Sequence, residues 1–268
     1  MAASRSTLDG IAYREFGSGD RVALLLHGYP QSSLMWEPAL AALAELGWRG
    51  VAPDLPGFGD SPPDRPGTWE RQIEAVMRLH AGLALGPVAL VMHDWGALIG
   101  LRWACENPGA VRALVISSSG FFPDGKWHGM ARGMRTEGTG EELLEGMTRE
   151  SFGELMRWAS HAIDDGAIDE YWRCFADSDR RAAQLDLYRS GDFEKLARYE
   201  GQLAALGVPT LLLWGSDDQF APLAGGHRLD REIPHAELQV LDGVRHFVWD
   251  DEPERSTAAL SGFVRSLP

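Results

Sequence analysis

An aspartate stands where a strand is expected to turn sharply into a helix. Asp94 follows the apolar run Pro87–Met92 and precedes Ala97–Glu106, whose apolar residues have helical spacing. A strand, a sharp turn and a helix together present one side chain above the edge of a parallel sheet. A carboxylate is ionised at neutral pH and needs no base to become a nucleophile. We therefore interpret Asp94 as a nucleophile rather than as a simple cap of the following helix.

This type of nucleophile restricts the substrate. A serine oxygen that attacks a saturated carbon gives an ether, which an active site cannot easily hydrolyse, whereas a carboxylate gives an ester, which it can. Asp94 therefore predicts a substrate with an electrophilic sp3 carbon. A histidine would then be free to activate water against the ester.

Two further loops offer the partners that such a nucleophile needs. Trp214–Asp218 and Gly243–Phe247 each follow a predicted strand, and ligand sites of open α/β sheets lie at the carboxyl ends of strands. The second loop supplies His246 as a base, and the first supplies Asp217 or Asp218 as an acid. The order nucleophile, acid, histidine is the one expected of a nucleophile on this type of turn.

The elements that must position these residues alternate along the chain. We expect strands over Ile11–Phe16, Val22–Leu26, Trp48–Pro53, Pro87–Met92, Val111–Ile116, Val208–Trp214 and Glu237–Leu241. We expect helices over Ser33–Leu46, Thr68–Leu85, Ala97–Glu106, Leu223–Glu232 and Glu252–Ser266. The alternation predicts an α/β fold with a mostly parallel, doubly wound sheet, in which Ile11–Phe16 is an edge strand.

The alternation stops in the middle of the chain. Residues 121–204 have helical and loop patterns but no convincing buried strand, and joints containing Gly and Pro flank them at Gly120–Pro123 and Gly207–Pro209. We therefore expect a helical cap over 121–204, inserted into a core domain made of 1–120 and 205–268.

Composition excludes several classes of function. The chain has 268 residues with 44% hydrophobic and 24% charged residues, as in an ordinary globular protein. Its net charge of −14 argues against nucleic-acid binding. The polar Met1–Gly10 and the lack of long apolar runs predict a cytoplasmic protein without a membrane segment. Cys105 and Cys174 have no metal-binding or disulfide spacing, so we expect free thiols and no metal.

Taken together, the motifs resemble those of the α/β-hydrolase fold, in the group of epoxide hydrolases and haloalkane dehalogenases. The resemblance covers nearly the whole chain outside the cap. It is carried by His27–Pro30, Asp54–Ser61, His93–Gly96, Trp214–Gly215 with Asp218, and His246–Phe247.

The resemblance implies a role for each core residue. Asp94 would be the nucleophile, His246 the base for water, and Asp218 the acid that orients His246. The Gly-x-x-Asp spacing from Gly215 favours Asp218 over Asp217, which we expect on a surface turn. Backbone N–H groups of Tyr29 and Trp95 would form an oxyanion hole.

The cap decides which group leaves the substrate carbon. Leu187–Ser190 is similar to the Tyr-Arg segment of epoxide hydrolases, which makes Tyr188 the candidate acid for an epoxide oxygen. The second cap tyrosine of that family has no clear counterpart, and Trp127 or His128 could stand in its place. Trp127 could instead bind a halide together with Trp95. Tyr29 lies where many dehalogenases have Asn.

These observations predict a cofactor-independent hydrolase that uses water on a small apolar substrate. We favour an epoxide hydrolase that forms vicinal diols, with a haloalkane dehalogenase as the alternative. A catalytically silent ligand-binding member of the fold would be expected to lack a triad residue, and none is missing. We expect a monomer or a homodimer.

Overall fold

One sheet forms the centre of the molecule. The structure is a computed structural model that describes residues 4–267. In this part of the chain, eight strands lie in the order β1-β2-β4-β3-β5-β6-β7-β8. The β1·β2 and β2·β4 pairs are antiparallel, and the other pairs are parallel. The strands are β1 (Ser4–Leu8), β2 (Ile11–Phe16), β3 (Arg21–Leu26), β4 (Trp48–Pro53), β5 (Val88–His93), β6 (Val111–Ser117), β7 (Thr210–Gly215) and β8 (Ala236–Leu241).

The predicted α/β fold with a mostly parallel sheet is confirmed, with one error at its edge. Ile11–Phe16 is not the edge strand, because β1 (Ser4–Leu8) pairs with it along its whole length. Most of β1 is exposed and polar. It therefore has none of the apolar periodicity from which a strand is predicted.

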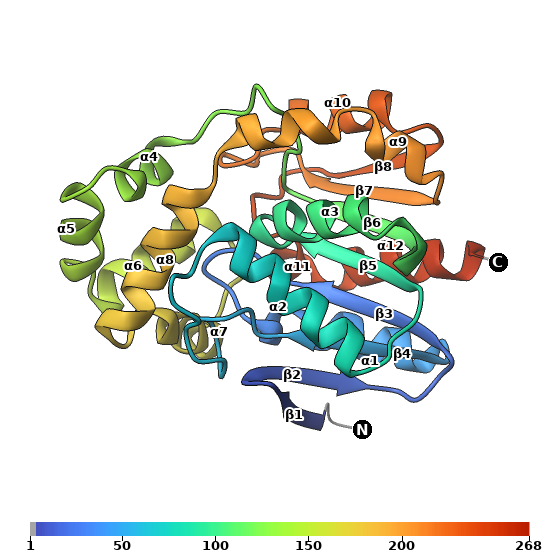
Figure 1. Cartoon of the computed structure of the whole chain (residues 1–268), viewed down its shortest axis with the longest axis horizontal. Helices are drawn as coiled ribbons and strands as arrows, with labels where there is room; N and C mark the ends of the chain where they lie inside the picture. Colours follow the sequence, from blue (N-terminus) through green and yellow to red (C-terminus); the bar gives the residue numbers. More distant parts are fainter. Residues whose placement is uncertain (1–3, 268) are drawn as a thin grey trace.

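Helices cover both faces of the sheet. In Figure 1, α2 and α3 lie in front of the sheet, with α1 and α12 behind it. The predicted helix over Ser33–Leu46 is divided into a 3-10 turn, Ser33–Trp36, and α1, because Pro38 starts a new helix at its first turn. The core helices are α1 (Glu37–Glu45), α2 (Trp69–Gly82), α3 (Trp95–Glu106), α10 (Leu223–Glu232), α11 (Val248–Asp251) and α12 (Pro253–Ser266).

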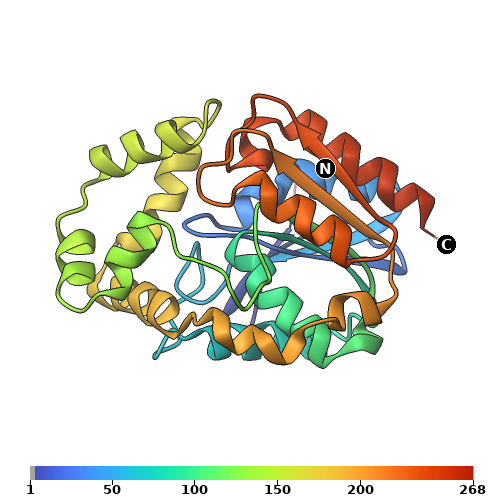
Figure 2. The ribbon, with the colours of Figure 1, turned by 90° about the horizontal axis from the view of Figure 1, so that it is seen from above.

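The segment between β6 and β7 is helical. Its helices are α4 (Gly129–Arg135), α5 (Thr139–Glu145), α6 (Arg149–Ala159), α7 (Asp165–Trp172), α8 (Ser178–Ser190) and α9 (Gln202–Leu206). Figures 1 and 2 place α4 to α8 together at one end of the molecule, beyond the sheet. The short α9 packs on α3 instead, and our expected boundary after residue 204 falls within it.

Close packing in the core holds the carboxyl ends of the central strands in place. Every residue of β5 and β7 is buried, as are the last five residues of β3 and of β6. The loops that follow these strands therefore start from closely packed backbone. Among residues 4–267, no helix has both the length and the apolar character that crossing a membrane requires.

Candidate active site

Asp94 occupies a strained turn between β5 and α3. Its φ of 49° and ψ of −120° lie in a region that non-glycine residues rarely adopt. Neighbouring glycines make room for this turn. A Cβ on Gly28 would lie 2.5 Å from the Asp94 Cβ, and a Cβ on Gly96 would lie 2.2 Å from the Leu26 carbonyl oxygen. The Asp94 side chain does not cap α3; its Oδ1 accepts a hydrogen bond of 2.8 Å from the Tyr29 backbone N–H.

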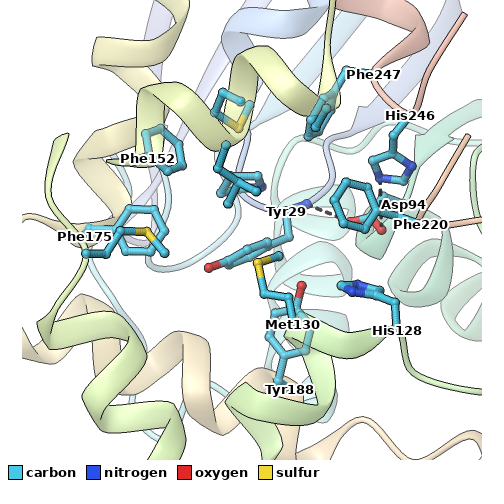
Figure 3. Close-up of a pocket in the computed structure, with 15 residues that line it drawn as sticks. Tyr29, Asp94, His128, Met130, Phe152, Phe175, Tyr188, Phe220, His246 and Phe247 are labelled. Carbon is cyan, nitrogen blue, oxygen red and sulfur yellow. Dashed lines mark hydrogen bonds and ion pairs between the residues drawn. The ribbon is translucent and has the colours of Figure 1, made fainter. Parts of the chain in front are cut away.

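His246 lies between two carboxylates. Its Nδ1 is 3.0 Å from both oxygens of Asp218, and its Nε2 is 3.6 Å from the Asp94 Oδ2. Figure 3 shows the imidazole directly beside Asp94. Asp218 also accepts hydrogen bonds from two backbone N–H groups of its own loop, those of Phe220 and Ala221. Asp217, by contrast, is exposed and contacts only Ser216 among its possible side-chain partners in residues 4–267.

His246 and the two carboxylates stabilise one another's charged forms. Burial alone would lower the pKa of His246, but Asp218 and Asp94 raise it to about 10. Burial alone would raise the pKa of Asp94, but His246 and the Tyr29 N–H hold it below its usual range. At neutral pH the site thus contains an ionised nucleophile beside an imidazolium.

Two backbone N–H groups were predicted to form an oxyanion hole at Asp94, those of Tyr29 and Trp95. The Tyr29 N–H already donates to Asp94. The Trp95 N–H belongs to the first residue of α3, and N–H groups in the first turn of a helix have no partner within the helix. These are the two groups expected to stabilise a negatively charged oxygen on an ester of Asp94.

Two buried histidines support the loops and lie outside the reacting group. His27 Nδ1 lies 2.8 Å from its neighbour's carbonyl oxygen, and its Nε2 accepts the Leu55 N–H. His93 lies behind His246, with ring centroids 5.0 Å apart, and its Nδ1 is 3.2 Å from the Ser117 hydroxyl. Burial and the neighbouring His246 lower the pKa of His93 to about 3, so it is neutral.

Tyr188 comes from α8 and reaches the nucleophile. Its side chain is buried, and its ring packs edge-to-face on Tyr29 and Trp95 at 5.0 and 5.2 Å. Figure 3 shows its hydroxyl pointing into the pocket between Tyr29 and His128. Burial and the Asp94 charge raise the pKa of this hydroxyl well above 10. It therefore remains protonated and can donate.

The other two cap candidates differ in what their N–H groups can do. The Trp127 indole stacks on Trp95 at 5.4 Å, but its N–H donates to the Gly191 carbonyl at 3.2 Å. A halide could use this N–H only if that bond broke. His128 accepts the Ala131 N–H on Nδ1 at 3.5 Å, and burial lowers its pKa. Its ring is thus neutral with the proton on Nε2, which makes it a possible donor.

Two hollows meet at Asp94. The larger encloses about 1120 Å³ of space, partly open to solvent, between the loop after β6, α10 and Trp127. The smaller spans about 480 Å³ of space, also partly open to solvent, and reaches toward α6; we call it the methionine pocket. Its walls away from Asp94 are Pro30, Met130, Met147, Phe152, Leu155, Met156, Ala159, Phe175 and Phe247, together with the Tyr29 ring.

The apolar residues that line the methionine pocket were not predicted from sequence. On α6, Phe152, Met156 and Ala159 recur at helical spacing and are buried. That spacing indicates an apolar face, but it does not tell whether the face meets other helices or a substrate.

Comparisons with known proteins identify the family to which the chain belongs. A family model described as alpha/beta hydrolase fold matches residues 22–253. Haloalkane dehalogenase 2 of Mycobacterium bovis is 30% identical over 93% of this chain and 90% of its own length. The cis-3-alkyl-4-alkyloxetan-2-one decarboxylase of Xanthomonas campestris is 27% identical over 96% of this chain and 93% of its own length.

Solved structures share the fold. The crystal structure of an epoxide hydrolase from Vigna radiata superposes with a TM-score of 0.83 at 23% identity, with 98% of each chain covered. The resemblance drawn from the motifs is thereby confirmed, and this protein is a member of the α/β-hydrolase fold family with haloalkane dehalogenases among its sequence relatives.

Proposed function

We propose that this protein is a hydrolase that opens small apolar epoxides through an ester on Asp94. The observation that carries the choice of epoxide is the pair of cap contacts at the leaving-group side. The Tyr188 hydroxyl is protonated and faces the pocket, whereas the Trp127 N–H is already bonded to Gly191. An alkoxide gains much from a proton donor, and a halide gains little.

In the first step, an Asp94 oxygen attacks an epoxide carbon and the bond from that carbon to the ring oxygen breaks. Tyr188 gives its proton to the departing oxygen, with the neutral His128 Nε2–H as a second donor. The product of this step is a hydroxyalkyl ester of Asp94. Trp95, whose indole adjoins Tyr188, lies where it can stabilise the tyrosinate that forms.

In the second step, water attacks the ester carbonyl. Because the ester carries no charge, His246 first loses its proton to solvent. The neutral His246 then takes the proton of the attacking water, and Asp218 stabilises the resulting imidazolium. The N–H groups of Tyr29 and Trp95 stabilise the oxyanion. When this intermediate collapses, the imidazolium protonates the departing diol oxygen. The acid proton left on Asp94 passes to the Tyr188 oxygen, which restores the Asp94 carboxylate.

A haloalkane is the second candidate, because a haloalkane dehalogenase is 30% identical to this chain and the Trp95 indole adjoins the nucleophile. The relative that acts on oxetan-2-ones adds a third electrophile, a strained lactone. All three would first form a covalent bond to Asp94, so the identity of the adduct distinguishes them.

The test is intact-protein mass spectrometry of His246→Gln after incubation with 1,2-epoxyhexane, 1-bromohexane or a dialkyl oxetan-2-one. We expect the whole epoxide to add to the protein and the ester to persist. If only the bromide formed an adduct, an alkyl ester, the protein would be a dehalogenase rather than an epoxide hydrolase. The control is Asp94→Ala/His246→Gln, which should acquire no mass. A His246→Gln variant that turns over normally without an adduct would refute the proposed role of His246.

The same scheme predicts how pH acts on the two steps. His246 has a pKa of about 10 because two carboxylates face it, and esterification of Asp94 removes one of these charges. The pKa of His246 should therefore fall in the ester, so that the neutral base forms at lower pH. Hydrolysis of the ester should slow as pH falls through this new pKa. Quenched-flow mass spectrometry of the unmodified enzyme should show more ester at pH 5 than at pH 8, and equal amounts would contradict the scheme.

A further inference from the structure

The methionine pocket is apolar except at one point. Asp94, His128, Tyr188 and His246 gather where the pocket meets the nucleophile. Beyond them, the only side chain in its wall with a hydrogen-bonding group is Tyr29.

The Tyr29 ring is held in one orientation by its neighbours. It packs edge-to-face on Tyr188 at 5.0 Å, on Phe58 at 6.1 Å and on Phe175 at 6.4 Å. Figure 3 shows the backbone N–H of Tyr29 directed at Asp94 and its hydroxyl pointing the opposite way, toward Phe175. One residue thus faces both the reacting group and the far part of the methionine pocket.

The Tyr29 hydroxyl has no hydrogen-bond partner in the described part of the chain. The residue is only 7% exposed, and its hydroxyl forms no hydrogen bond with any of residues 4–267. Tyr171 and Tyr199, also buried, each donate to a carboxylate, Asp250 and Glu106 respectively. The Tyr29 oxygen is not among the fully buried side-chain atoms that lack a partner, so it contacts the open space of the pocket, where a ligand can reach it. Burial raises the pKa of Tyr29 well above 10, so its O–H remains a donor.

We propose that the Tyr29 hydroxyl binds a hydrogen-bond acceptor on the substrate arm that fills the methionine pocket. The preferred substrates are then electrophiles whose apolar chain carries an ether, carbonyl or hydroxyl oxygen, rather than plain hydrocarbons. This inference rests on the proposed function, because it assigns the pocket to a substrate. It assigns the Tyr29 side chain a part in specificity that is separate from the part of its backbone N–H in catalysis.

The test compares 1,2-epoxyalkanes with isosteres in which one ether oxygen is moved along the chain. For the unmodified protein, we expect one oxygen position to raise kcat/KM about tenfold over the hydrocarbon of equal length, the order of one neutral hydrogen bond. Tyr29→Phe keeps the ring and the backbone N–H and should reduce this ratio to about one. Tyr199→Phe also removes a buried hydroxyl, but outside the site, and should keep the ratio. A ratio near one at every position, or a ratio that survives in Tyr29→Phe, would overturn the inference.

Two further measurements separate this inference from the proposed function. The same ether series can be made as bromides, so a protein that proves to be a dehalogenase still answers the question about Tyr29. Unreactive alkoxyalcohols and alkanols of equal length provide a test that needs no reaction. Calorimetry should show the ether bound about tenfold more tightly than the alkanol by the unmodified protein, and equally by Tyr29→Phe. Equal binding of both compounds by the unmodified protein would overturn the inference whatever reaction is catalysed.

Discussion

The two halves of the site are held in different ways. The core half consists of Asp94, Asp218 and His246, each on a loop after a strand of one sheet. The strands before Asp94 and Asp218 are fully buried, whereas β8, before His246, is an edge strand with only Leu241 buried. The cap half consists of side chains from the segment between β6 and β7, and its position depends on contacts made across the boundary between the two halves. We therefore expect the nucleophile and its base to tolerate changes in the cap, whereas the cap side chains that receive the substrate and its leaving group depend on these contacts.

Asp250 and Asp251, shortly after His246, form hydrogen bonds with the cap. Asp251 Oδ1 accepts hydrogen bonds from the Ser160 hydroxyl and from the N–H groups of His161 and Ala162, just beyond α6. Asp250 accepts one of 2.7 Å from the Tyr171 hydroxyl on α7 and one of 2.6 Å from Gln31. Since α6 forms a wall of the methionine pocket, these contacts position the substrate arm relative to His246.

The strongest test of the core half is Asp94→Ala. The nucleophile has no substitute within its reach, so turnover should fall by at least about 10⁴-fold, as for the removal of a triad residue. Diol release from 1,2-epoxyhexane measures this loss, and circular dichroism checks the fold. An Asp94→Ala enzyme within tenfold of the unmodified activity would refute the covalent mechanism.

A change in the cap half should have a smaller effect that depends on the leaving group. Tyr188→Phe removes only a hydroxyl and should slow ester formation from epoxides by about 10²-fold, the low end for a lost general acid. Ester formation from bromides should hardly change. Trp127→Phe is the matched control, because its N–H is already bonded to Gly191. Normal epoxide turnover in Tyr188→Phe, with bromide turnover crippled in Trp127→Phe or Trp95→Phe, would favour the dehalogenase.

The smallest effects on the chemical steps are expected at Asp250 and Asp251. Changes there should alter the free energy of unfolding instead. Asp251→Ala leaves the buried Ser160 hydroxyl and two part-buried backbone N–H groups without this acceptor. It should lower the free energy of unfolding by about 1 to 3 kcal/mol. Because α6 would loosen, KM should rise more than kcat falls. Thermal unfolding and steady-state kinetics measure both effects. A large fall in kcat at unchanged KM would contradict the division between the halves.

Asp250→Asn should raise the free energy of unfolding, in contrast to Asp251→Ala. Burial raises the pKa of Asp250 from 3.8 to about 6, so its contribution to stability is greatest below pH 3.8 and is lost as pH rises through 6. The amide removes this buried charge and should raise the free energy of unfolding at pH 8 by about 1 to 3 kcal/mol. Gln31 can turn to accept from the new amide, because its Oε1 has no partner in residues 4–267. If Asp250→Asn raised the free energy of unfolding no more at pH 8 than at pH 4, the ionised Asp250 would not destabilise the fold.

Much of the core half could be predicted from sequence because it depends on local order. The loops after parallel strands meet at the carboxyl edge of the sheet, and this rule predicted that Asp94, after β5, and His246, after β8, lie close together. The spacing from Gly215 identified Asp218, which the structure places on His246 while Asp217 points to solvent. The strand Ser4–Leu8 could not be predicted, because only its pairing with β2 holds it in the sheet.

The contacts of the cap half could not be predicted from the sequence. The sequence by itself determined that an ionised aspartate follows a buried strand, that an acid and a histidine follow later strands, and that a helical segment interrupts them. Only the tertiary structure decided that the Trp127 N–H is bonded to Gly191, and that the Tyr29 hydroxyl faces the methionine pocket without a partner among residues 4–267. The reason is physical: a strand or a turn follows from neighbouring residues, whereas the partner of a side-chain donor depends on how distant helices pack against the sheet.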